Sequence, residues 1–149
     1  MLGLLGFYDE LDTPSGQPNG SIRDALRSVG EPDEADLVAY LDAGHVLIDV
    51  MEAGHDVITG STHRHSLGCS SLVTDGTWLW RQDFPHYLET HHVSLPQTFL
   101  EHVRSLNYRM PPDAHHHRRA VRSALRRDHA PGRLGLGRPV AIDGDHART

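Results

Sequence analysis

The chain has 149 residues, of which 38% are hydrophobic and 23% charged, which suffices for one modest core and gives no reason to expect two domains. It contains no apolar run approaching the roughly 18–20 residues of a membrane-spanning helix, and residues 1–7 lack the basic flank of a secretion signal. Its single cysteine, Cys69, cannot form an internal disulfide, which fits a reducing compartment. We therefore expect a cytoplasmic protein with no membrane-spanning segment.

The charges are unevenly distributed along the chain, and all 14 basic residues are arginine. Residues 1–113 contain 17 Asp and Glu against 6 Arg, a net charge of −11, whereas residues 114–149 contain 3 acidic residues against 8 Arg, a net charge of +5. The proline pair at 111–112 ends the pattern of apolar positions. We therefore predict an acidic domain, residues 1–112, followed by a basic His- and Arg-rich tail, residues 113–149, that is flexible or partly helical.

Two helices are predicted in the first third of the chain, after a loop of turn-forming residues at 13–20. Ser21 is a favoured N-cap residue, and apolar residues at helical spacing follow it as far as about Val29. The second helix is expected to begin at Pro32, a favoured first-turn residue, and to end at Gly44. Its predicted apolar stripe consists of Leu37, Tyr40 and Leu41.

A β-hairpin is predicted for residues 70–80, because Asp75-Gly76 supplies the positive φ angles of a two-residue type I′ turn. The predicted cross-strand pairs are Thr74 with Thr77, Val73 with Trp78, Leu72 with Leu79 and Ser71 with Trp80. Side chains alternate along a strand, so both tryptophans are expected on one face and the two leucines on the other. Before the hairpin, Val46–Met51 favours a strand or a short helical turn, and residues 54–66 favour a loop.

Two further helices are predicted after the hairpin. The first is short, with Asp83 as its cap, and presents Phe84, Tyr87 and Leu88. The second begins at the capping-box pattern Ser94-Leu95-Pro96-Gln97 and continues to about Asn107 through Phe99, Leu100, Val103 and Leu106. The predicted class is α+β: a small single domain with an antiparallel β-hairpin or small sheet packed by several short helices, plus a C-terminal tail.

One part of the chain resembles a known pattern. The segment Leu72-Val73-Thr74-Asp75-Gly76-Thr77-Trp78-Leu79-Trp80, with Tyr87-Leu88, Leu95-Pro96 and Phe99-Leu100-Glu101-His102-Val103 after it, resembles small uncharacterised actinobacterial proteins and, more loosely, bacterial toxin-immunity proteins. The shared positions are mostly turn and core residues. The resemblance implies a small α+β domain and protein binding, and it carries over no catalytic residue.

The 13 histidines raise the question of metal binding. His63, His65 and Cys69 are the candidate ligands, since zinc accepts imidazole and thiolate groups. Two ligands close together and a third at an undiagnostic spacing do not define a tetrahedral site, and exposed loop histidines explain the pattern without a metal. For the adjacent pair His91-His92, whose side chains point in different directions, we expect structural or solvent-facing roles. We therefore expect no cofactor, and retain a zinc-binding protein or metal-dependent enzyme using His63, His65 and Cys69 as the alternative.

The basic tail suggests a weaker alternative, nucleic-acid contact through its arginines and the histidines at 115–117. Contact between the tail and the protein's own acidic surface explains the same charges. No assembled catalytic set is visible in the sequence, which favours a function without catalysis. We therefore expect a non-enzymatic protein-interaction module of immunity-like type that binds a basic protein partner through an acidic surface.

Overall fold

The computed structural model describes residues 2–11, 20–112 and 119. Its elements, in chain order, are β1 (Gly3–Leu5), the 3-10 helix η1 (Ile22–Ala25), α1 (Glu34–Asp42), β2 (His45–Ile48), β3 (Leu72–Thr74), β4 (Trp78–Arg81), α2 (Phe84–His91) and α3 (Gln97–Ser105). The predicted α+β class is confirmed. None of the helices within the described ranges has the length and apolar character needed to cross a bilayer.

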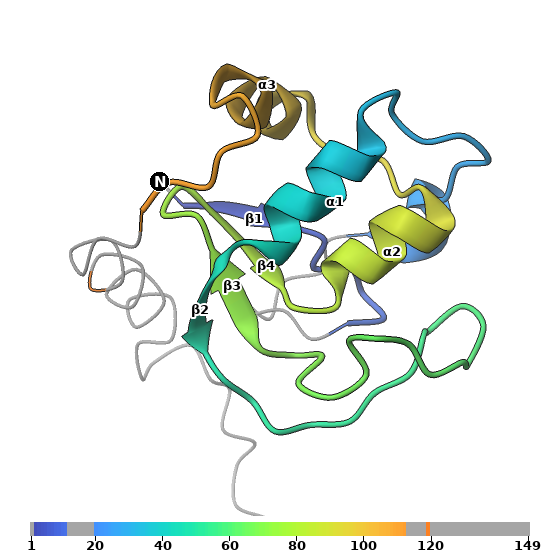
Figure 1. Ribbon diagram of the computed structural model, residues 1–149. Coiled ribbons are helices and arrows are strands. Elements are labelled where there is room, and N and C mark those ends of the chain that lie inside the picture. The colour runs from blue at the N-terminus through green and yellow to red at the C-terminus, as the bar shows by residue number, and fades with distance from the viewer. Residues whose placement is uncertain (1, 12–19, 113–118, 120–149) are drawn as a thin grey trace, which may run out of the picture.

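The four strands form one mixed sheet in the order β1-β4-β3-β2. Strand β1 lies parallel to β4, and β3 lies antiparallel to both of its neighbours. Figure 1 shows α1 and α2 side by side over one face of this sheet, while the long connection from β2 to β3 passes around the edge and beneath α2. The sheet is therefore larger than the predicted hairpin, because β1 and β2 extend it on both sides.

The hairpin forms at the predicted place but in a different register. Strands β3 and β4 pair Thr74 with Leu79, Val73 with Trp80 and Leu72 with Arg81. The predicted two-residue turn is wrong because the Asp75 side chain closes a wider one, with Oδ1 accepting the N–H groups of Thr77 at 2.9 Å and Trp78 at 2.7 Å. The register moves by an even number of residues, so the faces are as predicted.

Each face of the sheet carries its own apolar cluster. The helix-covered face contains the larger one, in which Trp80 is completely buried, its Nε1 donates to the Leu41 carbonyl at 3.3 Å, and its ring contacts that of Tyr40. Trp78 lies in the same cluster but is only partly buried; it packs edge-on against Phe99. The opposite face holds a smaller cluster around Phe7, Leu47 and Leu79, with Leu72 packed against it. Trp80, rather than Trp78, is therefore the anchor of the core.

The helices agree with the apolar pattern better than with the capping signals. Helix α1 buries the predicted Leu37, Tyr40 and Leu41. The helix expected over residues 21–29 is wrong: only the single turn η1 forms, although Ser21 does accept the Arg23 N–H as a cap. Helices α2 and α3 bury the expected stripes: Phe84, Tyr87 and Leu88 in α2, and Phe99, Leu100 and Val103 in α3.

The expected capping box at the start of α3 is also wrong. Pro96 occupies the N-cap position, and no side chain there makes a capping hydrogen bond. Ser94 instead donates its backbone N–H to the carbonyl of Ala25 at 2.9 Å, so it ties the segment before α3 to η1. Of the region predicted as a strand or helical turn, Val46–Met51, residues 46–48 belong to strand β2 and residues 49–51 to the connection that follows it. The predicted tail, residues 113–149, lies outside the described residues except for Arg119.

Candidate functional site

The connection between β2 and β3, residues 49–71, contains all three candidate metal ligands of the alternative hypothesis, His63, His65 and Cys69. It contains one short antiparallel contact, the bridge between Ala53 and Leu67. Around this bridge, Gly54 donates its N–H to the Ser66 carbonyl at 2.9 Å and Gly68 donates to the Glu52 carbonyl at 2.8 Å. We call residues 52–54 and 66–68 the loop ladder. It folds the connection into two facing segments and places its middle part against α2.

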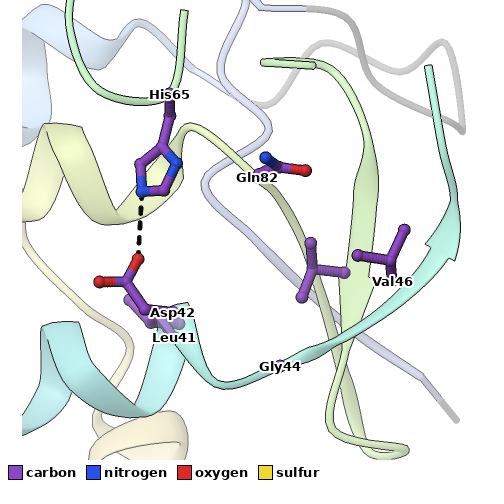
Figure 2. A pocket seen from close by; sticks show the side chains of 7 residues that line it. Leu41, Asp42, Gly44, Val46, His65 and Gln82 are labelled. Atoms are coloured by element: carbon purple, nitrogen blue, oxygen red, sulfur yellow. Dashed lines mark hydrogen bonds and ion pairs between the residues drawn. The ribbon is translucent and has the colours of Figure 1, made fainter. Parts of the chain in front are cut away.

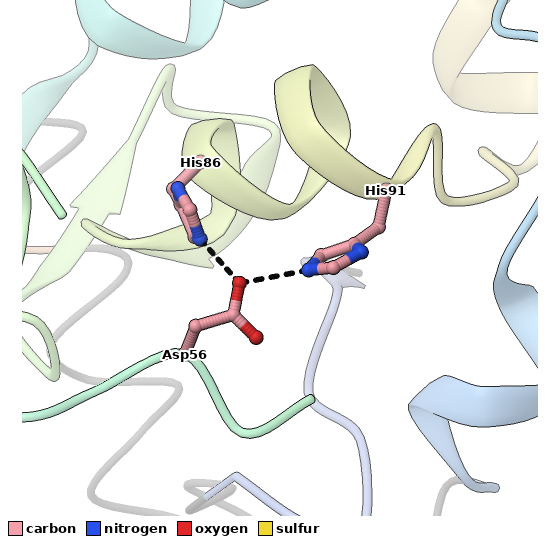
Figure 3. Close-up of side chains that lie close together, drawn as sticks. All are labelled: Asp56, His86 and His91. Carbon is pink, nitrogen blue, oxygen red and sulfur yellow. Dashed lines mark hydrogen bonds and ion pairs between the residues drawn. The ribbon is translucent and has the colours of Figure 1, made fainter. Parts of the chain in front are cut away.

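The middle of the connection is fixed by Asp56, whose side chain is buried. Its Oδ2 lies 2.6 Å from Nε2 of His86 and 2.7 Å from Nε2 of His91. Both histidines belong to α2, and Figure 3 shows their rings converging on the one carboxylate oxygen. The other oxygen, Oδ1, accepts the backbone N–H groups of Ile58 at 2.7 Å and Thr59 at 3.0 Å. We call Asp56, His86 and His91 the Asp56 cluster.

The surroundings keep the Asp56 carboxylate ionised. Burial acts to raise its pKa, but the hydrogen bonds from His86, His91 and the two backbone N–H groups outweigh that effect and hold the pKa below its ordinary value. Both imidazoles are themselves mostly buried, each with 13% of its side chain exposed. The cluster thus places a negatively charged carboxylate oxygen between two imidazole nitrogens in a mostly buried environment.

His63 lies against this cluster. Its ring stacks on that of His86, with centroids 3.8 Å apart and planes inclined by 6°. Its Nδ1 accepts the backbone N–H of His65 at 3.1 Å, which places the ring proton on Nε2. Burial, together with the neighbouring histidines, lowers the pKa of His63 to about 4. Among the described residues, the buried Nε2 atom has no hydrogen-bond partner.

His65 and Cys69 point to other places. His65 Nε2 lies 3.1 Å from Asp42 Oδ1, at a pocket of about 170 Å³ between the end of α1 and the sheet (Figure 2). Cys69 is buried, and this burial raises the pKa of its thiol. Its sulfur packs against the loop ladder so closely that a Cβ added to Gly54 would lie 2.7 Å from Sγ. A thiol in this position acts as a small packed side chain.

The structure therefore does not bring the three predicted ligands together. In the described part of the chain, the group whose ligand atoms converge within 4.8 Å is Asp56, His86 and His91. Sequence reasoning missed it because the two histidines are five positions apart, instead of the three or four positions that place side chains on one side of a helix. The expected structural role of the adjacent pair holds in part: His91 binds Asp56, and His92 turns away to Glu34 with Nδ1–O distances of 2.7 and 2.9 Å.

The outer side of the same connection is apolar and acidic. Met51, next to the loop ladder, is fully exposed at 101%, and Leu67, within it, is 80% exposed. Two exposed carboxylates lie close to Met51 in the chain: Glu52 accepts the Ser70 hydroxyl at 2.6 Å, and Asp49 accepts the Ser71 hydroxyl at 3.2 Å. We call Asp49, Met51, Glu52 and Leu67 the outer loop surface. It lies on the same connection as Asp56 but is exposed to solvent.

No protein-family model, curated protein or solved structure matches this chain. The resemblance of residues 72–103 to actinobacterial and immunity proteins accordingly stays an expectation. Function is best argued from the two features of the β2–β3 connection, its exposed outer surface and its buried carboxylate.

Proposed function

We propose that this protein is a non-enzymatic protein-interaction module that binds a basic protein partner, with the outer loop surface as the centre of contact. The observation that carries the proposal is the exposure of Met51 and Leu67 on the two segments that the Ala53–Leu67 bridge joins, with the exposed carboxylates Asp49 and Glu52 close to Met51 in the chain. Large apolar side chains exposed together, with polar groups around them, are typical of protein-binding surfaces. Methionine suits such a surface because its flexible thioether adapts to the partner.

The charges favour a basic partner. Four arginines of the described body are occupied by the protein's own acids: Arg27 with Glu31, Arg64 with Asp42 and Glu89, Arg81 with Asp83, and Arg104 with Asp33. Asp49 and Glu52, by contrast, form no ion pair within the described residues and are held by serine hydroxyls. A cationic surface would supply the missing countercharges, which would accelerate association and exclude acidic competitors.

An immunity-like role is the form of this function that we favour. A small acidic domain that covers the functional surface of a basic protein would block or position that protein without any chemistry of its own. The acidic body, net −11 over residues 1–113, supports this form because long-range attraction acts before contact is made.

Affinity capture with matched surface variants tests the proposal. The full-length chain is immobilised beside Met51→Ser/Leu67→Ser, Asp49→Asn/Glu52→Gln, and the control Val29→Ser, which removes an apolar side chain 75% exposed elsewhere. We expect one basic protein to be retained by the parent and the control, lost by the apolar variant, and released at lower salt by the charge variant. Equal retention by all four chains would place the contact elsewhere and refute the assignment of this surface.

A further inference from the structure

We propose that the Asp56 cluster binds a divalent first-row metal ion, with Zn²⁺ as the ion that its donors fit best. Two imidazole nitrogens and one carboxylate oxygen are a ligand set that zinc uses where a fourth position stays open to water or another ligand. His86 and His91 follow Asp56 in the chain by 30 and 35 residues, yet the three ligand atoms lie within 4.8 Å of one another. This site is independent of the docking function proposed above.

The distances show how little must change for an ion to enter. The two nitrogen–oxygen contacts are now 2.6 and 2.7 Å, as in hydrogen bonds. Around a tetrahedral Zn²⁺ with bonds of about 2.0–2.1 Å, neighbouring ligand atoms lie about 3.4 Å apart. Each contact therefore has to lengthen by about 0.7–0.8 Å, and the two imidazole nitrogens, which lie within 4.8 Å of each other, have to reach a similar spacing. Small rotations of the two imidazole rings can supply these changes.

The neighbouring groups already orient two of the ligands. Asp56 Oδ1 is held by the backbone of residues 58 and 59, so Oδ2 remains directed at the histidines. His86 Nδ1 lies 3.3 Å from Oγ1 of Thr90, one turn further along α2. A hydroxyl can donate to Nδ1 or accept from it, so Thr90 supports His86 both as the present Nε2–H donor and as a metal ligand protonated on Nδ1. Such partners are typical around metal-binding histidines.

His63 is a second, independent observation that favours a further ligand beside the Asp56 cluster. It contacts His86 directly, yet its buried Nε2 has no partner among the described residues. Buried polar atoms are rarely left in this state, and an absent water or ion is a common reason. A water on the open metal position would bring an acceptor to this side of the cluster. The two histidines alone would satisfy a purely structural Asp56, but they offer no acceptor to the His63 nitrogen.

Zinc titration of the full chain tests the site. The consecutive histidines at 115–117 compete for metal, so the calorimetric series uses a chain in which these three are glutamine. We expect one equivalent of Zn²⁺ to bind near neutral pH. His86→Gln and His91→Gln should each weaken binding by more than the roughly 10- to 100-fold that loss of an outer partner costs.

The matched control is His102→Gln, which removes a histidine whose Nε2 lies 2.9 Å from Oδ2 of another buried aspartate, Asp75. It should leave zinc affinity unchanged. Unchanged affinity in His86→Gln and His91→Gln, or no stoichiometric binding at all, overturns the proposal.

A second measurement does not depend on any variant folding. In long-range ¹H–¹⁵N spectra of the unmodified chain, the Nε2 resonances of His86 and His91 should move to metal-bound positions with the first equivalent of Zn²⁺. If those resonances stay in place while other histidines respond, the ion is bound elsewhere and the Asp56 cluster is a hydrogen-bonded support of the loop.

Discussion

Two of the buried aspartates, Asp75 and Asp56, form the same local turn but make different contacts through their second carboxylate oxygen. In each, Oδ1 accepts the N–H groups two and three residues further on, so the backbone fixes the carboxylate. The donors to Oδ2 differ: Tyr40 and His102 at Asp75, and His86 and His91 at Asp56. Asp75 thereby ties the hairpin turn to α1 and α3, whereas both donors to Asp56 come from the one helix α2.

This difference in donors assigns the two aspartates different roles: Asp75 supports the fold, and Asp56 belongs to the proposed ligand site. Asp75 lies where the hairpin meets the aromatic core, and a tyrosine hydroxyl at 2.5 Å completes its surroundings. Asp56 lies in a connection with little regular structure, and its side-chain donors are both metal-binding groups. The same turn motif therefore stabilises the core at one place and prepares a nitrogen–oxygen ligand set at the other.

The largest effect should come from the hairpin region. Trp80→Ala removes a completely buried ring, and truncating a buried tryptophan costs about 3–5 kcal/mol, a large share of the stability of a small domain. Trp78→Ala should cost clearly less, because that ring is partly exposed and packs mainly on Phe99. Denaturant unfolding of both variants measures the difference. Equal losses of stability in the two variants would mean that Trp80 does not anchor the hairpin more strongly than Trp78 does.

This pair also marks the limit of prediction from sequence. Alternation along the strands places both tryptophans on one face, and that expectation is confirmed. The predicted register is wrong because Asp75-Gly76 predicts a two-residue turn, whereas Asp75 Oδ1 closes a wider one that pairs Val73 with Trp80 instead of Trp78. Hydrogen bonds from the backbone of a turn to an aspartate side chain change the length of the turn, and the alternation of apolar residues along the strands does not predict them.

The second effect compares the two carboxylates directly. Asp75→Asn removes the charge that binds Tyr40 and His102, and hydrogen bonds to charged groups contribute about 1.5–3 kcal/mol, so the free energy of global unfolding should fall by that amount. Asp56→Asn should cost less globally and instead speed amide exchange in residues 56–61, because the connection opens without the core. Hydrogen exchange with denaturant melts separates the two outcomes. A global loss from Asp56→Asn as large as that from Asp75→Asn would contradict the distinction.

The Asp56 cluster could not have been predicted from spacing. The sequence places His63, His65 and Cys69 within seven residues, but in the structure His63 stacks on His86, His65 lies beside Asp42 and Cys69 packs against Gly54. His86 and His91 become partners of Asp56 only through the path of a long connection across α2. Long-range convergence of this kind is a property of the tertiary fold.

A smaller effect tests whether the packing of Gly54 against Cys69 supports the loop ladder. Gly54→Ala places a methyl group 2.7 Å from Cys69 Sγ, which should destabilise the protein by about 1 kcal/mol, the lower end for overpacking, since the surface segment can shift. Cys69→Ala in the same chain removes the obstructing sulfur and should recover most of that loss. Thermal melts of the two single variants and the double variant form the necessary cycle. Additive losses would show that the ladder does not rest on Cys69.

The smallest effect concerns Asp33, a partly exposed carboxylate, in contrast to the buried Asp75 and Asp56. Arg104 binds its two oxygens, each at 3.0 Å, and Tyr108 donates to it as well. The Arg104 hydrogen bond, only partly opposed by burial, lowers the pKa of Asp33 from 3.8 to about 2.

A carboxylate with a depressed pKa stabilises the fold fully above its unfolded value, and that contribution is lost as the pH falls through the folded value. The melting temperature of the parent should therefore exceed that of Asp33→Asn by at most a few degrees above pH 3.8, and the gap should close as the pH falls to about 2. In an Arg104→Gln background the gap should be small at every pH, because the partner that depresses the pKa is gone. A gap that persists unchanged at low pH would mean that Asp33 acts through the helix start and Tyr108 rather than through its charge, leaving surface ion pairing without a part in holding α1 to α3.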